Sequence, residues 1–220
     1  MNTKDGLKQT WQDSVLDSII AMARGDDGDF VLLDRIAKTT SEPQGLQKVI
    51  DWLSQTPQGK AAFEKRPRVG TIDLQHLSQL PPDTLGYAYA QHFMDNHLKL
   101  MTPHSANNDF EFLGAHLGET HDIWHVVTGC NTMILGEIQL EAFYVGQLSA
   151  SRFWLALLVK NLLKATIGDI EVSGQYMDAI AKGWLMAKQA KPLFGIEWNQ
   201  LWEKPLEEVR DSLNVVSIDI

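Results

Sequence analysis

Apolar residues recur at intervals of three and four along most of the chain, and this spacing restricts its fold more than any other feature. Trp11, Val15, Ile19 and Met22 follow the spacing, and Gly25 comes next as a helix terminator. Further helices are predicted at residues 29–39, 44–54, 84–99, 152–167, 174–191 and 204–213. The pattern therefore predicts an all-α protein, a helical bundle, with at most a short strand or a tail at residues 215–220.

Length and composition indicate a single globular domain over residues 1–220. The apolar fraction of 44% and the charged fraction of 21% are those of a soluble protein. The apolar run Phe153–Val159 is far shorter than the roughly 20 residues that a membrane span needs. The N-terminal residues have no apolar signal-like core. We therefore expect a cytoplasmic protein that contacts the inner face of a membrane peripherally, if at all.

Charge and cysteine content exclude several classes of partner and site. The net charge of −9 argues against a nucleic acid partner, because no basic stripe is present to displace counterions. Cys130 is the only cysteine, so an intramolecular disulfide and a cysteine-based zinc cluster are both excluded. A metal site in this chain must therefore use nitrogen and oxygen ligands.

Four such side chains lie within seventeen residues: His121, Asp122, His125 and Glu137. On a helix, His121 and His125 lie about 40° apart and one turn apart, so two imidazoles can share one ion. Asp122 points about 100° away from His121, where its carboxylate can be a ligand at the edge or a hydrogen-bond partner of a histidine. The histidine pair and its acid predict a divalent metal site.

Glu137 can join this site only if the helix breaks and the chain turns back. On a continuous helix it would lie about 18 Å from His125 along the axis. The stretch from Thr128 to Asn131 provides the break, because Gly129 suits a left-handed C-terminal residue and Asn131 or Thr132 suits an N-cap. We therefore predict a site shared by two helices.

Other polar residues are weaker candidates. Thr84 and Gly86 open a predicted helix whose free amides can bind a phosphate or carboxylate, although a plain N-cap is the alternative. Tyr89 and Phe93 lie on that helix and can line a pocket, as can His92. His116 can be an additional ligand or substrate contact, or an ordinary hydrogen-bonded histidine.

The helices at 152–167 and 174–191 are strongly apolar, and the chain holds seven Trp and seven Met. Such large, adaptable side chains suit an apolar pocket or tunnel for an isoprenoid chain, although most of them must belong to the core. If part of this apolar surface is uncovered, it would form a homodimer interface or a membrane contact.

The sequence His121-Asp122-x-x-His125-x11-Glu137 resembles the signature of the coenzyme Q (ubiquinone) biosynthesis protein four family. Weaker blocks resemble the same family in the same order: Arg66-Pro67-Arg68, Leu80-Pro81-Pro82-Asp83-Thr84-Leu85-Gly86, Phe93-Met94, Gly136-Glu137 and Leu201-Trp202-x-x-Pro205-Leu206-x-x-x-Arg210. The resemblance covers most of the chain.

This resemblance implies an all-helical fold and a divalent metal ion, whether zinc, magnesium or iron, held by His121, Asp122, His125 and Glu137. It implies a prenyl lipid or prenylated quinone precursor as partner, and other quinone-biosynthesis enzymes as further partners. The implied reaction is oxidative decarboxylation of a prenylated benzoate at C1, with hydroxyl replacing the carboxyl group.

Two other functions remain open. The protein can be a non-catalytic isoprenoid-binding scaffold in which the metal orders the headgroup end of the pocket. It can also be a zincin-like metallohydrolase, with Asp122 as the base and Glu137 as the third ligand.

Overall fold

The computed structural model describes residues 3–26, 29–102, 104–149 and 151–219, and these residues form helices joined by loops. The α-helices are α1 (Thr3–Arg24), α2 (Phe30–Thr40), α3 (Pro43–Leu53), α4 (Pro57–Lys65), α5 (Leu74–Leu77), α6 (Leu85–Asp95), α7 (Asp109–Thr128), α8 (Ile134–Leu148), α9 (Arg152–Ile167), α10 (Ser173–Gln189) and α11 (Leu206–Leu213). Short 3₁₀ helices lie at η1 (Ile170–Val172) and η2 (Trp198–Gln200). Among the described residues no strand is present, which confirms the all-α fold, and residues 215–219 form a tail.

Most predicted helices are present, and the differences have local causes. Helix α9 has the predicted bounds, whereas α6 ends at Asp95 instead of near Lys99. Asn96 ends α6, because its side-chain amide donates to the carbonyl of His92 at 2.8 Å. His97 then adopts a left-handed conformation with φ of 52°, which a helix cannot continue through.

Helix α4 was not predicted, because Pro57 and Gly59 read as loop residues. In the structure Pro57 is the first helical residue, where its fixed φ and missing N–H are tolerated. The Thr56 hydroxyl accepts a hydrogen bond from the Gly59 N–H at 3.0 Å and caps the helix.

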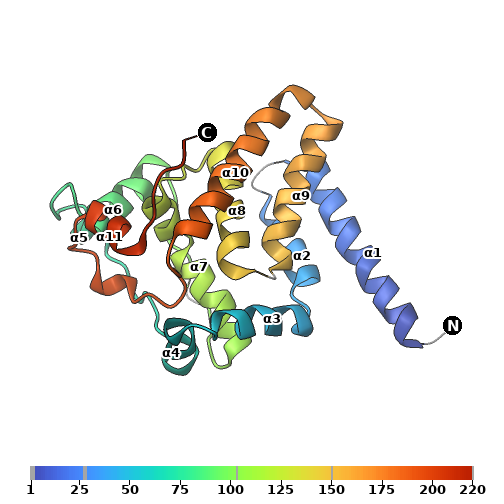
Figure 1. Cartoon of the computed structure of the whole chain (residues 1–220), viewed down its shortest axis with the longest axis horizontal. Coiled ribbons are helices and arrows are strands. Elements are labelled where there is room, and N and C mark those ends of the chain that lie inside the picture. The colour runs from blue at the N-terminus through green and yellow to red at the C-terminus, as the bar shows by residue number, and fades with distance from the viewer. Residues whose placement is uncertain (1–2, 27–28, 103, 150, 220) are drawn as a thin grey trace.

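Helix α8 lies in the middle of the fold and packs closely against α10 (Figure 1). A Cβ on Gly183 of α10 would lie 1.9 Å from the Gln139 carbonyl oxygen of α8. Further along the pair, a Cβ on Gly146 would lie 2.5 Å from the Ala187 side chain. Glycine at these two points lets the backbones approach more closely than any side chain would allow.

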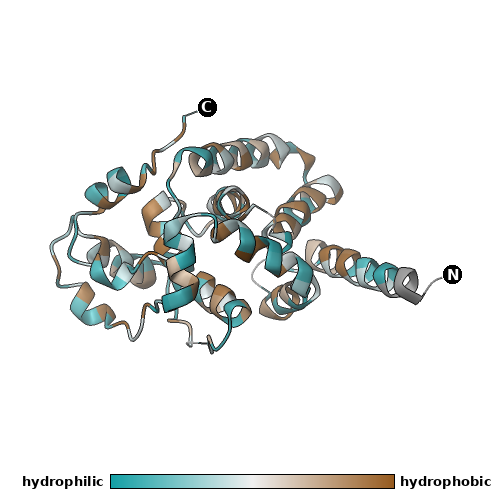
Figure 2. Cartoon of the chain, turned by 60° about the horizontal axis from the view of Figure 1, so that its bottom comes forward, coloured by the Kyte–Doolittle hydropathy of each residue, from teal (hydrophilic) through white to brown (hydrophobic). Residues whose placement is uncertain are grey.

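The apolar faces of the helices turn toward a shared core (Figure 2). Ile36, Leu85 and Phe143 come from different parts of the chain and are completely buried in it. The N-terminal end of α1 extends away from the other helices, and its packing on α2 and α9 includes Trp11, whose Nε1 donates to the Thr39 carbonyl at 2.9 Å and whose ring contacts Arg152 (Figure 1).

The segment Arg66–Pro67–Arg68 runs along α7 and is bonded to it at three levels. Arg66 pairs with Asp109 at 2.9 Å, at the start of the helix. The Pro67 carbonyl lies 3.3 Å from Nδ1 of His116. Arg68 Nε bonds both carboxylate oxygens of Glu119, at 2.9 and 3.0 Å. Together these contacts fix α7 just before the residues of the metal motif.

The C-terminal segment holds α6 and α7 from the opposite side. The amides of Leu85 and Gly86 donate to the carbonyls of Lys204 and Trp202, at 2.9 and 2.8 Å. Arg210 donates from Nε to the Val127 carbonyl at 2.9 Å and from Nη2 to the Val126 carbonyl at 2.8 Å. Arg210 therefore satisfies carbonyl groups at the C-terminal end of α7 that the helix itself leaves unpaired.

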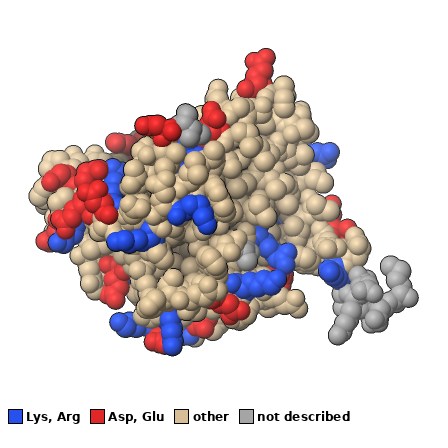
Figure 3. Space-filling view, in the orientation of Figure 1, with Lys and Arg blue, Asp and Glu red and all other residues tan. Residues whose placement is uncertain are grey.

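On the face shown in Figure 3, acidic and basic side chains are interspersed among uncharged ones. Across the described residues, none of the helices combines the length and the apolar composition needed to cross a membrane.

Candidate metal centre

The residues of the motif lie on α7 and α8, which the chain joins through a tight turn. Helix α7 ends at Gly129, whose φ of 73° is left-handed, as predicted. The predicted N-cap is displaced, because Met133 precedes α8 and Asn131 instead accepts the Met133 N–H at 3.0 Å. A Cβ on Gly136 would lie 2.1 Å from the Asn131 carbonyl oxygen. Glycine before Glu137 therefore lets α8 fold back against the turn.

His121, His125 and Glu137 converge across this turn. One ligand atom from each lies within 4.8 Å of the others. Nε2 of His125 and Oε1 of Glu137 are 3.3 Å apart. Two imidazoles and a carboxylate are the donors that zinc and iron bind in catalytic sites with three protein ligands.

The other ring nitrogen of each histidine has a partner of its own. Nδ1 of His125 lies 2.9 Å from the Cys130 carbonyl, which can only accept, so Nδ1 carries a proton and Nε2, which faces Glu137, is the nitrogen that could bind an ion. Nδ1 of His121 lies 3.4 Å from the Tyr144 hydroxyl. The surroundings thus orient both rings in the way that histidine ligands require.

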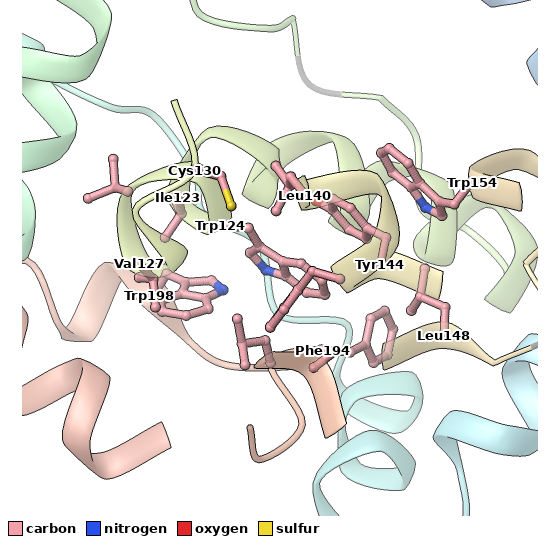
Figure 4. Close-up of a cluster of buried hydrophobic side chains, with 14 of the residues drawn as sticks. Ile123, Trp124, Val127, Cys130, Leu140, Tyr144, Leu148, Trp154, Phe194 and Trp198 are labelled. Atoms are coloured by element: carbon pink, nitrogen blue, oxygen red, sulfur yellow. The ribbon is translucent and has the colours of Figure 1, made fainter. Parts of the chain in front are cut away.

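An aromatic stack of Trp124, Tyr144 and Trp154, all three labelled in Figure 4, lies beside His121. The rings of Tyr144 and Trp154 are nearly parallel with centroids 3.8 Å apart, and Trp124 lies 4.3 Å beyond Tyr144. The His121 ring lies 5.9 Å from Tyr144 and 6.0 Å from Trp154. This layer covers the His121 side of the centre, whereas the Glu137 side chain is 35% exposed.

The pKa values of the three donors depend on burial and on one another. Burial, and then the charge of His125, lower the pKa of His121 to about 4, so its ring is neutral at pH 7. Burial acts against the charged form of His125, but the hydrogen bond and charge of Glu137 outweigh it and raise the pKa of His125. Burial likewise acts against ionised Glu137, but the His125 hydrogen bond and the charges of His125 and His121 together outweigh it and lower the pKa of Glu137. Two imidazoles and an ionised carboxylate fit a divalent metal ion, which on binding would displace the proton that Glu137 favours on His125.

Asp122 lies beside this group and does not belong to the three mutually close donors. Its Oδ1 is 3.0 Å from Nε2 of His92, on α6. The His92 ring also stacks on His125, with centroids 5.5 Å apart. The helix pattern predicted only that His92 can line a pocket, because its contact with Asp122 spans thirty residues and follows no motif.

His116 lies elsewhere on α7. Nε2 accepts the Gly195 N–H at 3.0 Å, and Nδ1 faces the Pro67 carbonyl. Its ring packs against Phe194 with centroids 4.9 Å apart and is almost fully buried. His116 therefore connects α7 to the segments that contain Pro67 and Gly195. These contacts do not support the prediction that it is a ligand or a substrate contact.

The amides at the start of α6 already have protein partners. Those of Leu85 and Gly86 bond the C-terminal segment, and that of Tyr87 bonds the Thr84 hydroxyl at 3.3 Å. Tyr89 and Phe93 are both 2% exposed, and their rings pack together at 4.8 Å. In the structure these contacts connect the start of α6 to the C-terminal segment and to the core. The substrate contacts predicted at Thr84, Gly86, Tyr89 and Phe93 stay predictions.

Two cavities lie on other parts of the described chain. One, of about 490 Å³, has a polar lining that includes His76, Asn199 and Lys204. The other, of about 240 Å³, lies between α3, α8 and α10 and is lined by Trp52 and Phe194 among others. Neither cavity is lined by His121, His125 or Glu137.

Comparison with known proteins connects this centre to a family. The family model described as "Coenzyme Q (ubiquinone) biosynthesis protein Coq4" matches residues 6–219. The chain belongs to the Coq4 family. Helices α7 and α8, with the His-Asp-x-x-His and Gly-Glu residues, therefore lie within a match that covers nearly the whole chain.

Relatives in the Coq4 family come from distant organisms. A mitochondrial ubiquinone biosynthesis protein COQ4 homolog of Drosophila sechellia is 27% identical over 202 residues, which is 84% of this chain and 69% of that protein. The mitochondrial COQ4 protein of Uncinocarpus reesii is 27% identical over 92% of this chain and 72% of its own length. A crystal structure of a candidate ubiquinone biosynthesis protein from Nostoc punctiforme matches with a TM-score of 0.83 and 27% identity, over 94% of this chain and 99% of that one.

Proposed function

We propose that this Coq4-family protein is a metal-dependent protein of ubiquinone biosynthesis, which binds a prenylated quinone precursor and acts on its ring. The observation that carries the proposal is the convergence of His121, His125 and Glu137 across one turn, with Nδ1 of both histidines facing other partners. Apolar packing alone does not account for this arrangement, because it places a half-buried carboxylate beside two imidazoles, one of them fully buried.

His121 and His125 would hold the ion through Nε2, and Glu137 through a carboxylate oxygen. Asp122, the fourth predicted ligand, lies beside them. A bound redox-active ion would mediate the transfer of two electrons to an external oxidant such as dioxygen, which the replacement of a C1 carboxyl group by hydroxyl, with loss of CO₂, requires. The chain itself contributes fixed ring orientations, a negative charge at Glu137 and the aromatic stack of Trp124, Tyr144 and Trp154, which covers the His121 side of the centre.

A second candidate function is a scaffold that binds an isoprenoid lipid without converting it. The burial of one donor favours this alternative, because the His125 side chain is 1% exposed and neither of the two cavities is lined by the donors, whereas the Glu137 side chain is 35% exposed. In that case the metal would order one end of a lipid site. Membership of the Coq4 family supports both candidates over a zincin-like hydrolase.

Metal analysis of protein purified without chelators tests the proposal. We expect about one divalent ion per chain in the wild type, and little in His125→Ala or Glu137→Gln. Iron or manganese would agree with an oxidative step, whereas zinc or magnesium would overturn redox chemistry at this centre while retaining the metal site. Full metal content in both variants would overturn the site itself.

Lipid extraction from the same samples separates the two functions. Mass spectrometry of wild-type extracts should detect a prenyl compound. An enzyme should convert an added prenylated benzoate and lose this conversion in His125→Ala. A scaffold should retain less lipid in that variant, and neither protein should show turnover.

The predicted homodimer and membrane contact are also part of the proposal. Leu155 and Val159 on α9 and Trp184 and Leu185 on α10 are apolar and between 41% and 53% exposed. Light scattering should detect a dimer if α9 or α10 forms the interface. Flotation with anionic vesicles should detect membrane contact, and Leu155→Glu should reduce whichever association exists.

A further inference from the structure

His92, on α6, contacts two members of the metal motif from outside α7 and α8. Its Nε2 lies 3.0 Å from Oδ1 of Asp122, and its ring stacks on that of His125 at an interplanar angle of 27°. Its side chain is 10% exposed, compared with 28% for Asp122. His92 therefore fills the space between α6 and the edge of the metal centre.

The direction of the hydrogen bond follows from the chemistry of a metal ligand. A carboxylate that coordinates a cation is ionised and can only accept a hydrogen bond, so His92 donates from Nε2, which lies 3.0 Å from Oδ1 of Asp122. Among the described residues, Oδ1 is the only oxygen of Asp122 with a hydrogen-bond partner, and Oδ2 is left for another ligand.

The contact with His92 concerns Asp122, the one predicted ligand that lies outside the group of three close donors. His121, His125 and Glu137 lie close together without help from α6, whereas Asp122 lies outside their group. A short carboxylate at the edge of a site is useful to an ion only if its orientation is fixed. Hydrogen-bond partners of metal ligands do this, and losing one weakens metal binding by about 10- to 100-fold.

We propose that His92 is a positioning residue that orients the Asp122 carboxylate toward the ion, with one oxygen held by the imidazole and the other free for coordination. This inference rests on the proposed metal site. It assigns α6 a part in that site, which neither the sequence motif nor the three-donor group includes.

Titration of the full chain with Co²⁺ tests this role, because binding and the visible absorption spectrum both report on the ligands. His92→Leu should weaken Co²⁺ binding by about 10- to 100-fold and change the spectrum. His92→Gln should restore much of the affinity, because its amide N–H can replace Nε2. His76→Leu is the matched control, since His76 is exposed on α5 and should leave the affinity unchanged.

A double-mutant cycle shows whether His92 acts through Asp122. Asp122→Asn should weaken binding at least as much as His92→Leu, and the double variant should bind no more weakly than Asp122→Asn alone. Losses that multiply, or a wild-type affinity and spectrum in His92→Leu, would overturn the inference. If His92→Leu does not fold, His92→Gln and His92→Asn make the comparison, and the shorter Asn should bind more weakly.

His125→Ala distinguishes failure of the inference from failure of the proposed function. If His125→Ala loses Co²⁺ and His92→Leu does not, the metal site stands and only the role of His92 is wrong. If His125→Ala binds Co²⁺ as the wild type does, the proposed metal site itself is wrong.

Discussion

Nε2 of His116 accepts a hydrogen bond from the backbone N–H of Gly195 at 3.0 Å, so this imidazole must be neutral in the folded protein. The proton then resides on Nδ1, which can donate to the Pro67 carbonyl. Protonation of Nε2 would bring two N–H groups together in a buried space. Burial is the main reason that the pKa of His116 is lowered to about 4.

The stability of the protein should therefore fall in mild acid. Above the unfolded pKa of about 6.5, His116 is neutral in both states and has no effect. Between pH 6.5 and about 4, the unfolded chain binds a proton that the folded protein does not, so the free energy of unfolding decreases as the pH falls. Below pH 4 this effect levels off, after a total of about 3 kcal/mol.

Urea unfolding at pH 7.5, 5.5 and 4.5 checks this prediction. His116→Gln keeps a donor and an acceptor but cannot titrate, so it should be less stable at pH 7.5 and should lose less stability in acid. Equal pH slopes for the wild type and His116→Gln would show that other groups cause the acid sensitivity.

Replacing Arg210 should destabilise the end of α7. Arg210→Ala leaves the carbonyls of Val126 and Val127 without their charged donor, which should lower the free energy of unfolding by about 2–3 kcal/mol. Glu207→Gln is the control, because this exposed partner of Arg210 should contribute less than about 1 kcal/mol. Similar losses in the two variants would contradict a capping role for Arg210.

Gly183→Ala should force α8 and α10 apart. The added Cβ would meet backbone atoms of Gln139, which cannot move without shifting α8, so a loss of about 1–3 kcal/mol is expected. Gly174→Ala on the same helix has no atom within 4 Å of its added Cβ and should be neutral or slightly stabilising. Thermal unfolding of both variants measures the difference, and a neutral Gly183→Ala would mean that α10 is more loosely packed than described.

Cys130 should report the opening of the turn between α7 and α8. It is 4% exposed, and burial raises the pKa of its thiol to about 11, so little thiolate exists at pH 8. A thiol reagent such as Ellman's reagent should therefore react slowly with the native protein and rapidly in urea. A divalent ion that bridges His125 and Glu137 should slow the reaction further. Rapid labelling of the native protein would contradict a closed turn.

The sequence predicted the centre better than its surroundings. The two-helix arrangement of His121, His125 and Glu137 was predictable, because helix periodicity and one left-handed glycine at Gly129 determine it locally. The contact of His92 with Asp122 was not, because it depends on how α6 packs against α7. The capping of α7 by Arg210 could not be predicted for the same reason, since 83 residues separate Arg210 from Val127.

The C-terminal segment has a consequence for the order of events during synthesis. Trp202 and Lys204 hold the start of α6, and Arg210 holds the end of α7. On a ribosome, His92 and His125 emerge long before these partners exist. The helices that carry the candidate metal centre therefore lack these contacts until residues far downstream have been made. A metal ion that bound His125 and Glu137 during that time would hold α7 and α8 together before the C-terminal contacts form.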